Sequence, residues 1–226
     1  MIDWQKIKTV FLDMDGTLLD LHFDNYFWLE HVPQRYSETN NVSFTESRDK
    51  LIGLFESHRG SLNWYCLDFW SDQLMLDIAG LKEEVQYKIA IRPNAEIFLQ
   101  QLRDHDKQVI IVTDAHYDSI KLKLRKTALH EKVDSVICSH DFQRPKQDPD
   151  FWNTFQQVEP FDLGTTLFID DSLPVLRAAQ TYGFKHLLSI SQPDSQRPAQ
   201  PNDEFISLND FSEIFPKPST VTNNND

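Results

Sequence analysis

The chain has 226 residues and a formal net charge of −13, and 40% of its residues are apolar and 25% charged. This length allows one large domain, or a core with a smaller insert, and the composition is typical of a globular protein. The acidic excess argues against general nucleic-acid binding, which depends on clustered Lys and Arg, and no apolar run is long enough to span a membrane.

The N-terminal residues and the cysteines indicate the cellular compartment that we expect for the protein. Residues Met1 to Lys8 are charged and lack the apolar centre of a signal peptide. Cys66 and Cys138 lie far apart and without the spacing of a metal site, which fits a reducing compartment. We therefore expect a cytoplasmic protein with small-molecule rather than membrane partners, and no obligatory protein partner is evident.

The first predicted strand, Thr9–Met14, ends with Asp13 and Met14, and Asp15 and Gly16 follow it directly. Residues two apart in a strand point to the same side, so Asp13 and Asp15 should be neighbours where the strand ends. Carboxylates this close raise the pKa of one of them unless a cation lies between them. Mg²⁺ is the natural cation because it is small and prefers oxygen ligands. The alternative is an ordinary strand end with solvated acids.

Residues 21–91 contain many aromatic side chains and little strand pattern. Among these aromatic residues are Phe23, Tyr26, Phe27, Trp28, Phe44, Phe55, Trp64, Tyr65, Phe69 and Trp70. We expect a helical cap over the carboxyl edge of a sheet, inserted into a core formed by residues 1–20 and 92–215. The aromatic residues either form the cap's own core or contact a ligand.

Strand and helix patterns alternate in the remainder of the chain. The predicted strands are Gln108–Thr113, Ser135–Ser139, Thr166–Asp170 and Phe184–Ile190, and the predicted helices are Asn94–Asp104, His116–Ala128, Pro149–Val158 and Ser172–Tyr182. Short apolar strands separated by helices are typical of an α/β fold with a doubly wound parallel sheet. We expect the lysines of helix 116–128 to face solvent, residues 205–215 to form a short helix, and residues 216–226 to be disordered.

Polar residues follow three of these strands. Thr113 and Asp114 end the second strand, Lys146 follows the third, and Asp170 and Asp171 end the fourth. Each has an ordinary explanation, which is helix capping for the threonine and the aspartates and solvation for the lysine. In an open α/β sheet, however, the carboxyl ends of the strands meet at one crevice, where ligands bind.

Taken in this order, these segments resemble motifs I to IV of the haloacid dehalogenase (HAD) superfamily of phosphohydrolases over nearly the whole chain. The resemblance implies that Asp13 attacks phosphorus to form an aspartyl-phosphate. It implies that Asp15 protonates the leaving oxygen and later deprotonates the attacking water. Thr113 and Lys146 would hold the phosphoryl oxygens, and Asp114 would contribute its backbone N–H.

The resemblance also implies a Mg²⁺ cofactor. Its ligands would be Asp13, the backbone carbonyl of Asp15, and Asp170. Asp171 would either lie outside this ligand set or bind through water.

Further segments resemble the bacterial GMP/IMP 5′-nucleotidases of this superfamily. These segments are Leu18–Leu21, Phe23–Trp28, Leu62–Asp68, Thr166–Ser172 and Pro193–Ser195. The resemblance implies hydrolysis of purine nucleoside 5′-monophosphates to nucleoside and phosphate. Aromatic side chains of the cap would suit the face of a purine, and Asn25 or Asn63 would suit its edge.

Other interpretations of the same residues remain open. The same chemistry would serve a phosphatase for a sugar phosphate or another small monophosphate, and a phosphomutase forms the same intermediate. A non-catalytic scaffold is a third alternative, because a fold alone does not establish activity. Dehalogenation of C–Cl bonds is disfavoured because the families with that activity lack the second aspartate, here Asp15.

Overall fold

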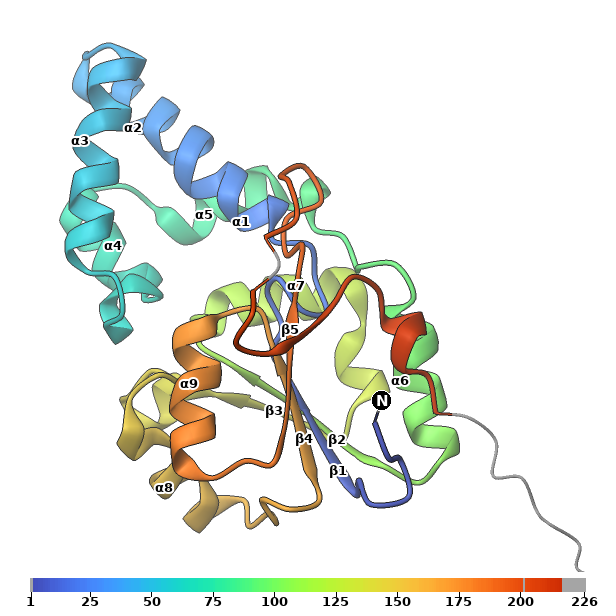
Figure 1. Ribbon diagram of the computed structural model, residues 1–226. Coiled ribbons are helices and arrows are strands. Elements are labelled where there is room, and N and C mark those ends of the chain that lie inside the picture. Colours follow the sequence, from blue (N-terminus) through green and yellow to red (C-terminus); the bar gives the residue numbers. More distant parts are fainter. Residues whose placement is uncertain (1, 201, 217–226) are drawn as a thin grey trace, which may run out of the picture.

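The computed structural model describes residues 2–200 and 202–216. Its centre is a six-stranded sheet with the strand order β3-β2-β1-β4-β5-β6 (Figure 1). The strands are β1 (Thr9–Leu12), β2 (Gln108–Thr113), β3 (Ser135–Cys138), β4 (Thr166–Asp170), β5 (His186–Ile190) and β6 (Ile206–Leu208). Every neighbouring pair is parallel, which confirms the predicted doubly wound sheet.

Helices cover both faces of this sheet (Figure 1). α6 (Ala95–Asp104) and α7 (Tyr117–Thr127) lie on one face, and α8 (Pro149–Val158) and α9 (Leu173–Tyr182) lie on the other. Along β1, Val10 and Leu12 pack toward the first pair of helices, whereas Phe11 packs toward the second. Because both faces are buried, the strand is apolar at every one of these positions, and it becomes polar only where it leaves the sheet.

A helical insert follows β1, as the sequence predicts. Its helices are α1 (His22–Tyr26), α2 (Val32–Asn40), α3 (Phe44–Ser57), α4 (Leu67–Leu74) and α5 (Ile78–Glu84), and a π-helical turn, Phe27–His31, joins the first two. Phe23, Phe27, Phe55 and Trp70 are buried in a core within the insert. The exact division into a core of 1–20 and 92–215 and a cap of 21–91 stays a prediction.

The chain enters and leaves the insert at neighbouring points. The Asp20 N–H donates to the Ala90 carbonyl at 2.9 Å. Leu19 and Ile91 form an isolated antiparallel bridge beside this bond. The two ends of the insert are therefore held together by the backbone itself.

The segment 205–215 differs from the single helix that we expected. It contains β6 and a 3₁₀ turn, Phe211–Ile214, which begins with a capping box formed by Asp210 and Glu213. A strand of three residues at a sheet edge is too short to show a clear pattern in sequence. The expected tail lies outside the described residues from position 217 onward.

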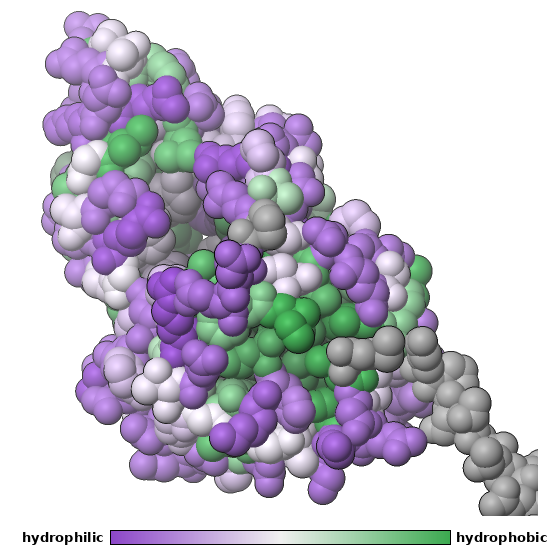
Figure 2. All heavy atoms as spheres, viewed as in Figure 1, coloured by the Kyte–Doolittle hydropathy of each residue, from purple (hydrophilic) through white to green (hydrophobic). Residues whose placement is uncertain are grey.

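The surface and the helices show two further features. Hydrophilic residues cover much of the face seen in Figure 2, and a recess separates the insert from the body around the sheet. Among the residues that the structure describes, no helix is both long enough and apolar enough to cross a membrane.

Candidate active site

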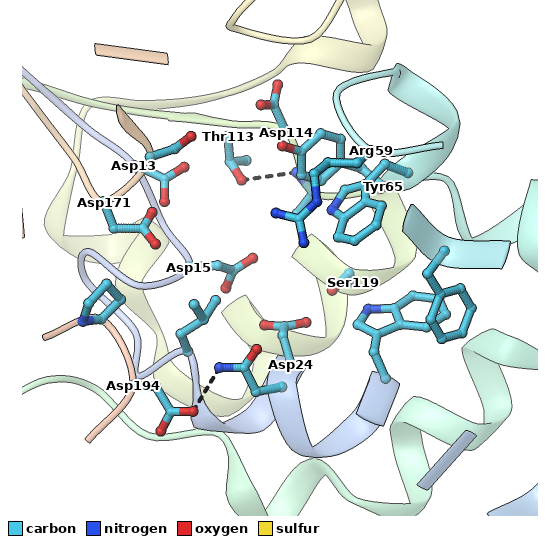
Figure 3. Close-up of a pocket in the computed structure, with 18 of the residues that line it drawn as sticks. Asp13, Asp15, Asp24, Arg59, Tyr65, Thr113, Asp114, Ser119, Asp171 and Asp194 are labelled. Carbon is cyan, nitrogen blue, oxygen red and sulfur yellow. Dashed lines mark hydrogen bonds between the residues drawn. The ribbon is translucent and has the colours of Figure 1, made fainter. Parts of the chain in front are cut away.

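A cavity of about 680 Å³ lies between the insert and the carboxyl ends of the strands (Figure 3). The polar residues predicted at the strand ends all line it, namely Asp13, Asp15, Thr113, Asp114, Lys146, Asp170 and Asp171. Trp28, Trp64 and Tyr65 of the insert form part of the opposite wall. The volume falls within the range of about 300–1,000 Å³ that is usual for small-molecule sites.

Lys146 connects the ends of β1 and β4. Its Nζ donates to Asp13 Oδ1 at 2.5 Å, to Asp170 Oδ2 at 2.7 Å and to the Val112 carbonyl at 3.0 Å. An ammonium has three N–H donors, and all three are used here. The side chain is 2% exposed, which excludes the solvated surface lysine that was the ordinary explanation.

Carboxylates outnumber cations at this point of the cavity. Burial raises the pKa of Asp13 to about 7, although the ammonium of Lys146 opposes the shift. Burial, together with the charges of Asp13 and Asp170, raises the pKa of Asp171 well above its usual range. Asp13, Asp170 and Asp171 share the single ammonium of Lys146, so the cluster carries more negative charge than Lys146 compensates.

Gly16 allows one of these carboxylates to come close to the loop after β1. Its φ is +88°, and a Cβ at this position would lie 2.5 Å from Asp171 Oδ2. A side chain here would therefore displace the Asp171 carboxylate. Several oxygen donors with surplus negative charge, which this glycine allows to lie close together, fit the requirements of Mg²⁺.

Asp15 has a different basic partner from Asp13. Its Oδ2 lies 2.7 Å from Lys123 Nζ, and its Oδ1 is buried with no hydrogen-bond partner among the described residues. Burial raises the pKa of Asp15 to about 6 against the opposing effect of Lys123. One carboxylate oxygen is thus held, and the other is unpaired.

The side chains of Thr113 and Asp114 accept hydrogen bonds from the backbone of the loops around the cavity. Thr113 Oγ1 accepts the Ala115 N–H at 3.1 Å, which holds a turn ahead of α7 and is not a helix cap because the N-cap of α7 is His116; its own O–H can still donate. Asp114 Oδ1 accepts the Lys146 N–H at 2.9 Å, so this carboxylate holds the loop that carries the lysine. A carboxylate would repel phosphate, so the contribution of the Asp114 backbone N–H to phosphate binding stays a prediction.

Sequence reasoning missed a buried cluster beside Asp15, the Lys123–Asp24–Lys82 cluster. Lys123 Nζ contacts Asp24 Oδ2 at 2.8 Å, and Lys82 Nζ contacts Asp24 Oδ1 at 2.6 Å. Lys123 was expected to face solvent, but its side chain is 1% exposed. The available signal was its position three residues after Ile120, which places it on the buried face of α7.

The asparagines expected at a purine edge lie in different places. Asn25 lines the cavity, and its Nδ2 donates to Asp194 Oδ2 at 2.7 Å. Asn63 is exposed and does not belong to the cavity lining. Arg59, which the sequence did not single out, lies over the Trp64 ring at 5.1 Å from its centroid, and both residues line the cavity.

A second acidic group lies outside the predicted metal site. Asp68, His116 and Asp118 bring possible ligand atoms within 4.8 Å of one another. His116 Nε2 is 3.6 Å from Asp68, whereas His116 Nδ1 is 3.8 Å from Asp118. The carboxylates approach opposite ring nitrogens, so this arrangement does not favour one shared ion.

The fold and the strand-end residues define a class of enzyme, and comparison with known proteins agrees. The family model of the haloacid dehalogenase-like hydrolases matches residues 7–183. The chain belongs to this family, which confirms the resemblance found in its motifs, and it is a hydrolase.

Two relatives are similar to this chain over almost its whole length. The chain is 38% identical over 215 residues to the GMP/IMP nucleotidase YrfG of Escherichia coli (strain K12), and the match covers 95% of this chain and 97% of the relative. The protein of the same name from Shigella flexneri matches to the same extent.

Solved structures show the same fold at lower sequence identity. An HAD phosphatase from Thermococcus onnurineus has a TM-score of 0.78 and 23% identity, covering 92% of this chain and 96% of that one. The putative HAD-hydrolase YfnB from Bacillus subtilis, solved with magnesium, has a TM-score of 0.64 and 20% identity, covering 92% and 97%. The L-2-haloacid dehalogenase from Xanthobacter autotrophicus has a TM-score of 0.56 and 14% identity, covering 92% and 96%.

Proposed function

We propose that the protein is a Mg²⁺-dependent phosphomonoesterase that hydrolyses purine nucleoside 5′-monophosphates such as GMP and IMP to nucleoside and phosphate. The observation that carries this proposal is the meeting of Asp13, Lys146 and Asp170 at the strand ends, beneath a cavity walled by aromatic side chains. The extended match to a GMP/IMP nucleotidase supports the substrate class.

Asp13 acts as the nucleophile in this mechanism. Its carboxylate oxygen forms a bond to phosphorus while the bond from phosphorus to the nucleoside oxygen breaks, which gives an aspartyl-phosphate. Lys146 lies 2.5 Å from Asp13 and reduces the repulsion between the carboxylate and the phosphate dianion. The Thr113 hydroxyl donates a hydrogen bond to one phosphoryl oxygen, and Lys146 exchanges one of its three present acceptors for another.

Asp15 transfers the protons. It gives a proton to the leaving 5′ oxygen, and it then takes one from the water that hydrolyses the aspartyl-phosphate. A pKa of about 6 suits a group that must both donate and accept near neutral pH. The unpaired Oδ1 is the atom available for this exchange.

Asp13, Asp170 and the backbone carbonyl of Asp15 would hold Mg²⁺, with Asp171 beside them. When bound, this ion would neutralise charge on the phosphoryl group and help to align it with the nucleophile.

The insert provides the surface for the nucleoside. Trp28, Trp64 and Tyr65 offer aromatic faces for stacking, which is worth about 1–3 kcal/mol per base in single-strand binders. Asn25 has both a donor and an acceptor for the edge of a base, although its present partner is Asp194.

The test is phosphate release with Mg²⁺ from GMP, IMP, AMP, UMP, glucose 6-phosphate and phosphoglycolate. We expect GMP and IMP to be hydrolysed fastest, and we expect a chelator to abolish release from every substrate. A sugar phosphate as the best substrate would refute the substrate class but keep the mechanism. Release from none of the six would contradict the proposed function.

A further inference from the structure

We propose that Lys123 is a positioning residue for Asp15, and that Asp24 makes this positioning depend on the placement of the insert. The proposal rests on the proposed role of Asp15 in proton transfer. It adds a residue from α7 and a contact from α1 to the strand-end residues already described.

The geometry around Asp15 is the first support. Lys123 Nζ lies 2.7 Å from Asp15 Oδ2 and 2.8 Å from Asp24 Oδ2, so one ammonium bridges the two carboxylates. Figure 3 shows that Asp15 and Asp24 both face the cavity. Because Lys123 holds Oδ2, the orientation of the Asp15 carboxylate is fixed and Oδ1 is left without a partner.

The second support is that Asp24 is held from two parts of the molecule. Asp24 belongs to α1 of the insert, and Lys123 belongs to α7 beside the sheet. On its other side, Asp24 Oδ1 accepts from Lys82 of α5 at 2.6 Å, and Lys82 also donates to Ser119 of α7 at 3.1 Å. A displacement of the insert would therefore change the partners of Lys123 and, through Lys123, the orientation of Asp15.

The third support is the balance of charge. The ammoniums of Lys82 and Lys123 face the carboxylates of Asp15 and Asp24, with side-chain exposures of 4%, 1%, 19% and 16%. Desolvating ammoniums to this degree is costly unless each is paired. Asp15 is part of this balanced set, so its position is coupled to groups that do not touch the phosphoryl site.

The proposal predicts an effect on one chemical step. A strongly basic leaving group, such as a nucleoside 5′-alkoxide, needs the proton from a well-oriented Asp15. A weakly basic leaving group, such as p-nitrophenolate, departs without it. Loss of Lys123 should therefore slow substrates according to the basicity of their leaving groups, which a general loss of structure would not do.

The experiment compares Lys123→Met with wild type on p-nitrophenyl phosphate, phenyl phosphate and GMP, with circular dichroism to establish folding. We expect kcat/KM, which reports formation of the aspartyl-phosphate and not its hydrolysis, to fall about 10²-fold more for phenyl phosphate and GMP than for p-nitrophenyl phosphate. Lys123→Arg should recover part of the difference because it keeps the charge. Asp15→Asn should show the same dependence on the leaving group as Lys123→Met, but more strongly.

Lys82→Met is the matched control. Lys82 is similarly buried and also pairs with Asp24, but its ammonium contacts Ser119 rather than Asp15. This variant keeps the contact between Lys123 and Asp15, so its dependence on the leaving group should be weaker than that of Lys123→Met. If Lys123→Met does not fold, Lys123→Met/Asp24→Asn keeps the cluster balanced and gives the same readout.

The outcomes separate the two levels of the proposal. Equal losses on all substrates in Lys123→Met, with a leaving-group effect in Asp15→Asn, would show that Lys123 is only structural. The absence of a leaving-group effect in Asp15→Asn would overturn the role of Asp15 and, with it, the proposal for Lys123. The two aryl phosphates make the test independent of the purine assignment.

Discussion

Lys146 and Lys123 are both almost fully buried and each contacts an aspartate of the segment after β1, but their surroundings differ. Lys146 lies among Asp13, Asp170 and Asp171, where negative charge is in excess. Lys123 lies in a set in which ammoniums and carboxylates are equal in number. An excess of negative charge favours the binding of a cation, whereas a balanced set is satisfied without a ligand.

Asp13 beside Lys146 and Asp24 beside Lys123 have pKa values shifted in opposite directions. Burial raises the pKa of Asp13 to about 7 despite Lys146. Burial alone would also raise the pKa of Asp24, but Lys123 and Lys82 together lower it to about 2. Asp24 is paired with two ammoniums, whereas Asp13 and Asp15 are each paired with one, and this number decides the direction of the shift.

The largest effect is expected from removing the nucleophile, Asp13, beside Lys146. Asp13→Asn should lower kcat by more than about 10³-fold, since the covalent step then has no attacking carboxylate. The melting temperature should stay the same or rise, because one of the surplus charges is lost. Phosphate release and thermal unfolding measure the two effects, and a wild-type rate would rule out the covalent mechanism.

Removing a charge from the Lys123–Asp24–Lys82 cluster should instead lower the free energy of unfolding. Lys82→Met leaves Asp24 with one cation fewer, and breaking a buried pair in this way costs about 3–5 kcal/mol. Urea unfolding measures the change in the free energy of unfolding. Lys82→Met/Asp24→Asn restores the charge balance and should recover part of the loss; a single-variant cost below about 1 kcal/mol would show that the pair is not effectively buried.

The opposite pKa shifts predict opposite pH dependences in protein freed of metal by a chelator. The stability contributed by protonated Asp13 is fully present below its ordinary pKa of 3.8 and is lost as the pH rises through about 7. The contribution of Asp24 is present above 3.8 and is lost as the pH falls through about 2.

Unfolding free energies across this pH range provide the measurement. Asp13→Asn should gain stability over wild type when the pH rises from about 5 to about 8. Asp24→Asn should be less stable than wild type near neutral pH, and the difference should shrink in strong acid. Parallel curves for the two variants would show that the two places do not differ in charge balance.

The smallest effect is expected for an exposed ion pair beside the Lys123–Asp24–Lys82 cluster. Arg125 of α7 pairs with Glu83 of α5 at 2.7 Å, so it joins the same helices as the buried cluster, but the side chains are 50% and 48% exposed. Arg125→Met should change the unfolding free energy by less than about 1 kcal/mol, and added salt should reduce this difference. A loss comparable with that of Lys82→Met would mean that burial does not explain the contrast.

Most of the sheet could be predicted because its strands are short apolar runs with both faces buried. Thr166–Asp170 and Gln108–Thr113 match the structure at both ends, whereas Thr9–Met14 extends beyond β1. The backbone pairing continues just past β1, since the Asp13 N–H donates to the Ile169 carbonyl at 3.0 Å, and Met14 is also buried. β6 was missed because a strand of three residues carries too little pattern.

The candidate site could be predicted as a set of residues, but its individual contacts could not. The parallel topology alone brings the strand ends together, which is why Asp13, Lys146 and Asp170 meet as expected. The contact between Asp15 and Lys123 depends on how the loop after β1 packs against α7, which no local pattern in the sequence shows. Lysine is usually solvated, so a sequence pattern assigns it to the surface unless its partners are known.

The backbone contact between Asp20 and Ala90 makes the two ends of the insert a natural site for a graft. Because its entry and exit are already neighbours, a segment of different length could be grafted there without changing the register of any strand. Such a graft would have to supply a carboxylate for Lys123 to replace Asp24. Substrate preference could then be redesigned through this one junction, with the strand ends left as they are.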